Sequence, residues 1–256
     1  MLQDDCSPDA SHMKRDACSG VPVIDTESAA SSAQEQPLRI TADMLAPAAP
    51  RDDRVELESG MSRLPPVTLT LIAVMVAVFV WEMLGGVLKS EEAIVAGGAL
   101  VRARILAGEI WRLMSSVLLH ASPQHLLGNI VALYITGMTL EHLAGKKQAL
   151  LVFLLSGLTG ALLSIAMAPG PSVGASGAIF GVLGTALVTM YLQRDVYKVR
   201  DKRIMTVMAA WAVYQIAIGF VAPLIDNSAH IGGLVGGMLI ALMLRPRLAK
   251  RPVSPD

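Results

Sequence analysis

Residues 174–181 read Gly-Ala-Ser-Gly-Ala-Ile-Phe-Gly and open an uncharged run that continues to Tyr191. The run has the composition of a membrane helix, and Ser176 stands near its start between glycines. Small residues let two helix backbones come close together, so helix packing alone would explain the pattern. The rest of the chain decides whether Ser176 also has a chemical role.

The composition indicates an all-α, polytopic membrane protein. Of 256 residues, 53% are hydrophobic and only 16% are charged, and the mean hydropathy is +0.54. A soluble domain carries roughly 25% charged residues. The net charge is zero, so no electrostatic argument favours nucleic acid as a partner. The apolar residues predict six membrane-spanning helices near 67–88, 123–143, 149–168, 176–192, 204–224 and 229–244.

The two ends of the chain are polar. Residues 1–62 are rich in Ser, Asp, Glu, Ala and Pro, which predicts a mostly disordered cytoplasmic tail with at most a short helix near 51–60. It lacks the pattern of a signal peptide. Its two cysteines, Cys6 and Cys18, are interpreted as free thiols, and we expect no metal and no cofactor. Residues 63–246 would form the helical domain, and 247–256 a short basic cytoplasmic tail.

The connection at 89–119 is long for a loop. It is amphipathic, and we expect interfacial structure in it. Lysine and arginine are concentrated in alternate loops and in the C-terminal tail, which predicts that both termini are cytoplasmic. With that topology Ser176, His125, Asn129 and His230 all lie toward the outer side of the membrane. The Pro-Gly-Pro-Ser break at 169–172 would place Ser176 in a solvated hollow below the surface.

These polar groups have the chemistry of acyl transfer. A serine hydroxyl becomes a nucleophile when a base, usually histidine, takes its proton, so Ser176 and His230 form the candidate pair. His125 and Asn129 are four residues apart and share a helix face, where they can stabilise an oxyanion with the backbone N–H groups of Ala175 and Ser176. Taken singly, each of these residues could equally be a structural polar contact. His120 and His142 are interpreted as structural.

Glycines offer a way to bring the pair together. Gly233 and Gly237 form a G-x-x-x-G pattern below His230, and Gly177, Gly181 and Gly184 form a small face below Ser176. Close packing of these two faces would bring Ser176 within hydrogen-bond reach of His230.

The sequence resembles the rhomboid family of intramembrane serine proteases over roughly residues 98–244. Four ordered motifs carry the resemblance: Gly-Glu-Ile-Trp-Arg-Leu at 108–113, His-Leu-Leu-Gly-Asn at 125–129, Gly-Ala-Ser-Gly at 174–177 and Ala-His-Ile-Gly-Gly at 229–233. The resemblance implies a six-helix rhomboid-like bundle with an interfacial first loop, in the cytoplasmic (inner) membrane of a bacterium. It implies that the protein cleaves transmembrane proteins in the lipid bilayer.

The same resemblance implies roles for particular residues. Ser176 would be the nucleophile and His230 the general base of a dyad without an aspartate. His125, Asn129 and the backbone near Ala175 would form the oxyanion hole. Supporting roles would fall to the first-loop pair and to a set of small and aromatic residues: Trp111, Arg112, Gly174, Gly177, Phe180, Gly233 and Gly237. Residues 220–228 would form a mobile cap, and the helix with Trp211 would face the substrate.

Phe180 departs from the family pattern, because many bacterial members have a tyrosine at this position. A phenylalanine ring can still stack under the histidine, but it has no hydroxyl to offer. Two other functions stay open: a catalytically silent rhomboid-like protein that binds client transmembrane helices, and a transporter or channel. We find no inverted repeat of the kind that transporters contain, which argues against the last.

Overall fold

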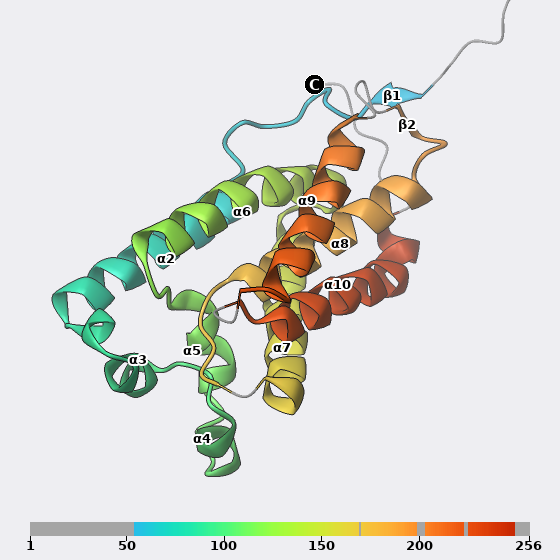
Figure 1. The fold of residues 1–256 in the computed structure, drawn as a ribbon. Coiled ribbons are helices and arrows are strands. Elements are labelled where there is room, and N and C mark those ends of the chain that lie inside the picture. Colours follow the sequence, from blue (N-terminus) through green and yellow to red (C-terminus); the bar gives the residue numbers. More distant parts are fainter. Residues whose placement is uncertain (1–53, 169, 199–202, 223–224, 249–256) are drawn as a thin grey trace, which may run out of the picture. The chain divides into compact units, whose positions relative to one another are not determined.

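The computed structural model describes residues 54–168, 170–198, 203–222 and 225–248. Six apolar helices dominate this part of the chain (Figure 1). They are α2 (Pro66–Leu84), α6 (Pro123–Ala144), α7 (Lys146–Met167), α8 (Ser176–Leu192), α9 (Arg203–Gly219) and α10 (Asn227–Leu248).

The predicted class, a polytopic helical membrane protein, is confirmed. Within the described residues, α2, α6, α7 and α10 are long and apolar enough to cross a bilayer, while α8 and α9 are apolar but shorter. Large apolar side chains stay exposed on these helices, among them Val80, Leu162 and Leu239. Such surfaces are costly in water and suit a lipid environment. A count of six spans stays a prediction.

The first connection, for which the sequence predicted interfacial structure without specifying its type, is largely helical. It contains the 3₁₀ turn η1 (Val87–Lys89) and three short helices, α3 (Glu91–Gly97), α4 (Arg102–Leu106) and α5 (Arg112–Leu118). Figure 1 shows them at the opposite end of the helices from the strands β1 (Val55–Glu56) and β2 (Tyr197–Lys198). Their position at a membrane surface stays a prediction.

Helix α8 is the central element. Most of its residues are buried, and it packs against α10, α7 and α6. Its bounds match the predicted segment 176–192. By contrast, α9 ends at Gly219 rather than near 224, and α10 runs from Asn227 to Leu248, past the predicted domain end at 246. Helix α9 contacts its neighbours only sparsely.

Two carboxylates tie α2 to the rest of the bundle. At its start, Glu141 of α6 accepts hydrogen bonds from the N–H groups of Val67 (3.2 Å) and Thr68 (2.5 Å) and from the Thr68 hydroxyl (2.6 Å). The first N–H groups of a helix lack partners within it, so Glu141 caps α2 from a neighbouring helix. In its last turn, the fully buried Glu82 accepts from the His120 N–H at 3.1 and 3.2 Å.

The described part of the N-terminal segment is more ordered than predicted. The sequence suggested at most a short helix near 51–60, but Val55–Glu56 form the strand β1, which pairs in parallel with β2. The next residue, Leu57, is buried in a cluster with Leu143, Met190 and Tyr197. The strand at Val55–Glu56 was not predicted. Cys6 and Cys18 lie outside the described residues.

Candidate active site

The coil before Ser176 is held by the first connection. Leu100 and Ser172 exchange backbone hydrogen bonds of 2.9 and 3.0 Å, and the Gly174 N–H donates to the Ser116 carbonyl at 2.8 Å. Gly174 has a φ of +124°, a conformation that favours glycine. Ala175 is fully buried and precedes the first residue of α8, which is Ser176. The backbone thus turns sharply into α8 with Ser176 at its tip.

The structure brings the Ser176 hydroxyl and the His230 imidazole together. The distance from Ser176 Oγ to His230 Nε2 is 2.9 Å, although the two residues are 54 positions apart. The imidazole stacks on Phe180 with a centroid distance of 4.4 Å and an interplanar angle of 12°. Phe180 in turn stacks on Trp211 of α9 at 5.6 Å. The ring of His230 is therefore fixed on one face by an aromatic pair and at its edge by the serine.

Glycines account for the closeness of α8 and α10. A Cβ at Gly233 would overlap the Gly177 carbonyl, and a Cβ at Gly237 would overlap the Gly181 carbonyl. A Cβ at Gly177 would lie 3.0 Å from the Ala229 carbonyl oxygen. Only glycine leaves room for this approach, which sets the register between Ser176 and His230.

His125 lies close to the coil that leads to Ser176. It sits in the first turn of α6, where its N–H donates to the Ser122 hydroxyl at 3.1 Å. A Cβ at Gly174 would be 2.7 Å from His125 Nε2, so the ring rests against a glycine two residues before the serine. Asn129 is buried and donates one amide N–H to the His125 carbonyl at 2.9 Å. Its second amide N–H makes no hydrogen bond to another residue within the described part of the chain.

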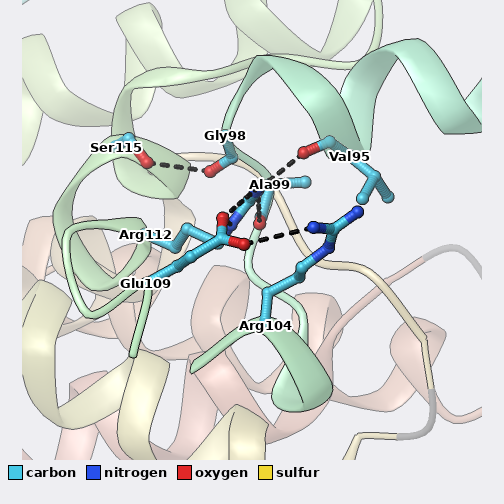
Figure 2. Close-up of polar contacts among 7 residues, drawn as sticks. All are labelled: Val95, Gly98, Ala99, Arg104, Glu109, Arg112 and Ser115. Carbon is cyan, nitrogen blue, oxygen red and sulfur yellow. Dashed lines mark hydrogen bonds and ion pairs between the residues drawn. The ribbon is translucent and has the colours of Figure 1, made fainter. Parts of the chain in front are cut away.

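Arg112, the second residue of the predicted pair Trp111 and Arg112, links segments of the first connection (Figure 2). Arg112 is buried and donates to the carbonyls of Val95 (2.6 Å) and Ala99 (2.9 Å), and its guanidinium pairs with Glu109 at 2.7 Å. The hydrogen bond from Arg112 holds the pKa of Glu109 below its usual value. Trp111 is half-exposed, with the Arg112 guanidinium 4.6 Å from its ring centroid.

An open cavity of about 350 Å³ lies between α4 and the coil near 168–171, with Arg102 and Pro171 among its lining residues. Neither Ser176 nor His230 lines it. Ser176 itself is partly exposed and His230 is 5% exposed. Of the predicted cap at 220–228, Pro223 and Leu224 lie outside the described residues, while Phe220 and Val221 are exposed. Among the described residues, no group of three His, Cys, Asp or Glu side chains is arranged to hold a metal ion.

Two polar contacts near the site were missed by sequence reasoning. Asp226 stands one helical turn before His230, and its carboxylate accepts a hydrogen bond from Ser164 of α7. The i to i+4 spacing from Asp226 to His230 was a signal that could have been used. The other contact joins Glu82 and His120. The His120 ring is fully buried and lies edge-on to His125, with a centroid distance of 5.2 Å.

The fold and the paired polar groups define a polytopic helical membrane protein with a serine and a histidine in contact between two helices. The model of the Rhomboid domain matches residues 107–247, more than half of the chain. The chain belongs to the rhomboid family.

Proteins that are similar in sequence to this chain also have rhomboid names. "Rhomboid protease GluP" of Bacillus subtilis is 37% identical over 180 residues, which are 70% of this chain and 35% of GluP. "Putative rhomboid protease YdcA" of the same organism is 33% identical over 146 residues, 56% of this chain and 72% of YdcA. "RHOMBOID-like protein 5" of Arabidopsis thaliana is 37% identical over 155 residues, 59% of this chain and 50% of that protein. The chain thus matches half or less of the length of two of these three relatives.

Proposed function

We propose that this protein is an intramembrane serine endopeptidase that hydrolyses peptide bonds in or near the transmembrane segments of other membrane proteins. The observation that carries the proposal is the 2.9 Å contact between Ser176 Oγ and His230 Nε2, with the imidazole stacked on Phe180. A nucleophile and a base within hydrogen-bond reach, with the base held by a third group, are the minimum for serine catalysis.

Each residue has a defined task in this mechanism. Ser176 Oγ attacks the scissile carbonyl carbon while its proton passes to His230 Nε2, and the same proton then goes to the leaving amine. Water next attacks the carbonyl carbon of the acyl-serine ester while its proton passes to His230; that proton then returns to Ser176 Oγ as the ester C–O bond breaks and the new carboxylate is released. The tetrahedral oxyanion accepts hydrogen bonds from the His125 ring, from the second amide N–H of Asn129 and from the backbone N–H groups of Ala175 and Ser176. Losing one such donor costs about 10²–10³ in kcat in a serine protease.

The apolar helices support a substrate that is itself a membrane protein, because the large apolar side chains exposed on them suit contact with lipid rather than water. Two relatives whose names contain the words rhomboid protease support proteolysis. The distribution of lysine and arginine supports cytoplasmic termini. The resemblance to bacterial rhomboid proteases supports the cytoplasmic membrane of a bacterium as the location. No metal or cofactor takes part in this mechanism.

The test is cleavage of a single-span substrate by the purified protein in lipid vesicles. Wild-type protein should cleave it, and Ser176→Ala and His230→Ala should each abolish cleavage. Ser59→Ala is the control, since it removes an exposed serine hydroxyl that lies outside the helices of the site, and it should cleave normally. A folded wild-type protein that binds the substrate without cutting it would instead favour the silent, client-binding alternative. Cleavage by Ser176→Ala would contradict the proposal.

A further inference from the structure

Asp226 is hydrogen-bonded to the first turn of α10, which contains His230. Its Oδ1 accepts from the Ala229 N–H at 3.0 Å, and its carbonyl accepts from the His230 N–H at 3.2 Å. A side-chain oxygen that satisfies the free N–H groups of a first turn is an N-cap, and aspartate is among the best residues for it. The conformation of the backbone at His230 therefore depends directly on Asp226.

The other carboxylate oxygen of Asp226 joins this turn to α7. Oδ2 accepts from the Ser164 hydroxyl, and Ser164 is 2% exposed. On the same face, a Cβ at Gly160 of α7 would lie 2.8 Å from the Ala229 carbonyl oxygen, so α7 and the start of α10 touch. Asp226 is thus held on both oxygens, which fixes where its negative charge lies.

Asp226 stands four residues before His230, and its carbonyl is hydrogen-bonded to the His230 N–H, so its carboxylate lies about one helical turn from the imidazole. His230 is buried, which disfavours a charged imidazole, and a nearby negative charge offsets that cost. In the described part of the chain, His230 Nδ1 is buried and has no hydrogen-bond partner. For Nε2 to accept the Ser176 proton, Nδ1 must already carry a proton, and the resulting imidazolium then has no acceptor at Nδ1. The imidazolium thus needs stabilisation through space.

We propose that Asp226 is a positioning residue whose charge stabilises the His230 imidazolium in the transition state, while Ser164 holds the carboxylate in place. This inference rests on the proposed serine protease function. It differs from a triad, because Asp226 bonds the backbone of α10 and Ser164 instead of the imidazole. The proton of Ser176 still moves to Nε2 and on to the leaving group, and Asp226 takes no part in the proton transfer.

A role for Asp226 as a helix cap alone would explain the same contacts. The experiment therefore distinguishes the effect of capping from the effect of the charge on His230. Asparagine caps a helix as well as aspartate does but is neutral, whereas glutamate keeps the charge and is a poorer cap. Asp226→Asn and Asp226→Glu therefore change the two properties in opposite directions. Asp226→Ser, a second neutral cap, serves if the asparagine variant does not fold.

The measurements are kcat and KM for a single-span substrate in vesicles, together with the thermal midpoint of unfolding. For Asp226→Asn we expect a midpoint near that of wild type, an unchanged KM and a kcat lowered by about tenfold. Asp226→Glu should retain more of kcat than Asp226→Asn despite a lower midpoint. Ser164→Ala should lower kcat by a smaller factor, because the carboxylate remains but is less firmly held.

The two proposals fail in different ways. Wild-type kcat in Asp226→Asn, or a kcat in Asp226→Glu that falls below that of Asp226→Asn, would reduce Asp226 to a cap and overturn this inference while the protease function stands. A wild-type protein that does not cleave at all would overturn the protease function, and this inference with it.

Discussion

The imidazole of His230 is held on two sides. Ser176 contacts its Nε2, and Phe180 covers one face of the ring. The stacking needs only an aromatic ring, so Phe180 orients the imidazole without a hydroxyl group. The residue motifs predicted which side chains meet here. They did not predict Asp226, because it bonds the backbone of α10 and Ser164 and contacts neither side chain of the pair directly.

His120 is a buried residue between α5 and α6, and its pKa links the stability of the protein to pH. Burial, and then the proximity of His125, lowers the pKa of His120 from 6.5 to about 4. The unfolded chain therefore takes up a proton near pH 6.5, while the folded protein resists protonation until about pH 4. The folded protein should accordingly be fully stable above pH 6.5 and should lose free energy of unfolding as the pH falls toward 4. At pH 5 the loss from this residue is about 2 kcal/mol.

The measurement is the midpoint of unfolding in detergent between pH 7.5 and pH 5, for wild type and for His120→Gln. Removing the titrating ring should make the pH dependence shallower. Equal slopes for the two proteins would mean that His120 is not the group responsible.

The helices were predicted with unequal success. Helix α8 has the predicted bounds because the Pro-Gly-Pro coil at one end and charged residues at the other mark them clearly. Helix α9 ends five residues before the predicted end, since the apolar residues after Gly219 continue the hydrophobic pattern without continuing the helix. Hydrophobicity alone cannot tell a helix from an apolar connection. Likewise, β1 was missed because a two-residue strand depends on its distant partner at β2.

The packing of α8 against α10 can be tested at Gly237, two turns below His230. A methyl group there would overlap the Gly181 carbonyl, so Gly237→Ala should lower the free energy of unfolding by about 1–3 kcal/mol. Gly128→Ala on α6 is the control, because nothing lies within 4 Å of the added methyl. Alanine also favours a helix over glycine by up to about 1 kcal/mol, so this variant should match or exceed wild type in thermal midpoint. Equal midpoints for the two variants would contradict the packing argument.

Across the molecule, contacts between distant parts of the chain hold the bundle in place. At the start of α2, Thr68 bonds Glu141, which is 73 positions away. At its end, Glu82 bonds His120, which is 38 positions away. The sequence predicted the helices that these residues belong to, but the pairing depends on how far one helix is shifted along another. That shift follows from packing and cannot be derived from periodicity within one helix. The predicted membrane topology depends on charges in the loops. Labelling the two termini from the cytoplasmic side tests it.

The central claim is that Ser176 is a nucleophile activated by His230. Its most direct test is reaction of the purified, membrane-embedded protein with a fluorophosphonate, followed by mass spectrometry to locate the adduct. The reagent should lose fluoride and form a bond from phosphorus to Ser176 Oγ in wild type. It should leave Ser176→Ala unmodified and modify His230→Ala far more slowly. An adduct that persists in Ser176→Ala, or a folded wild-type protein that forms none, would contradict the claim.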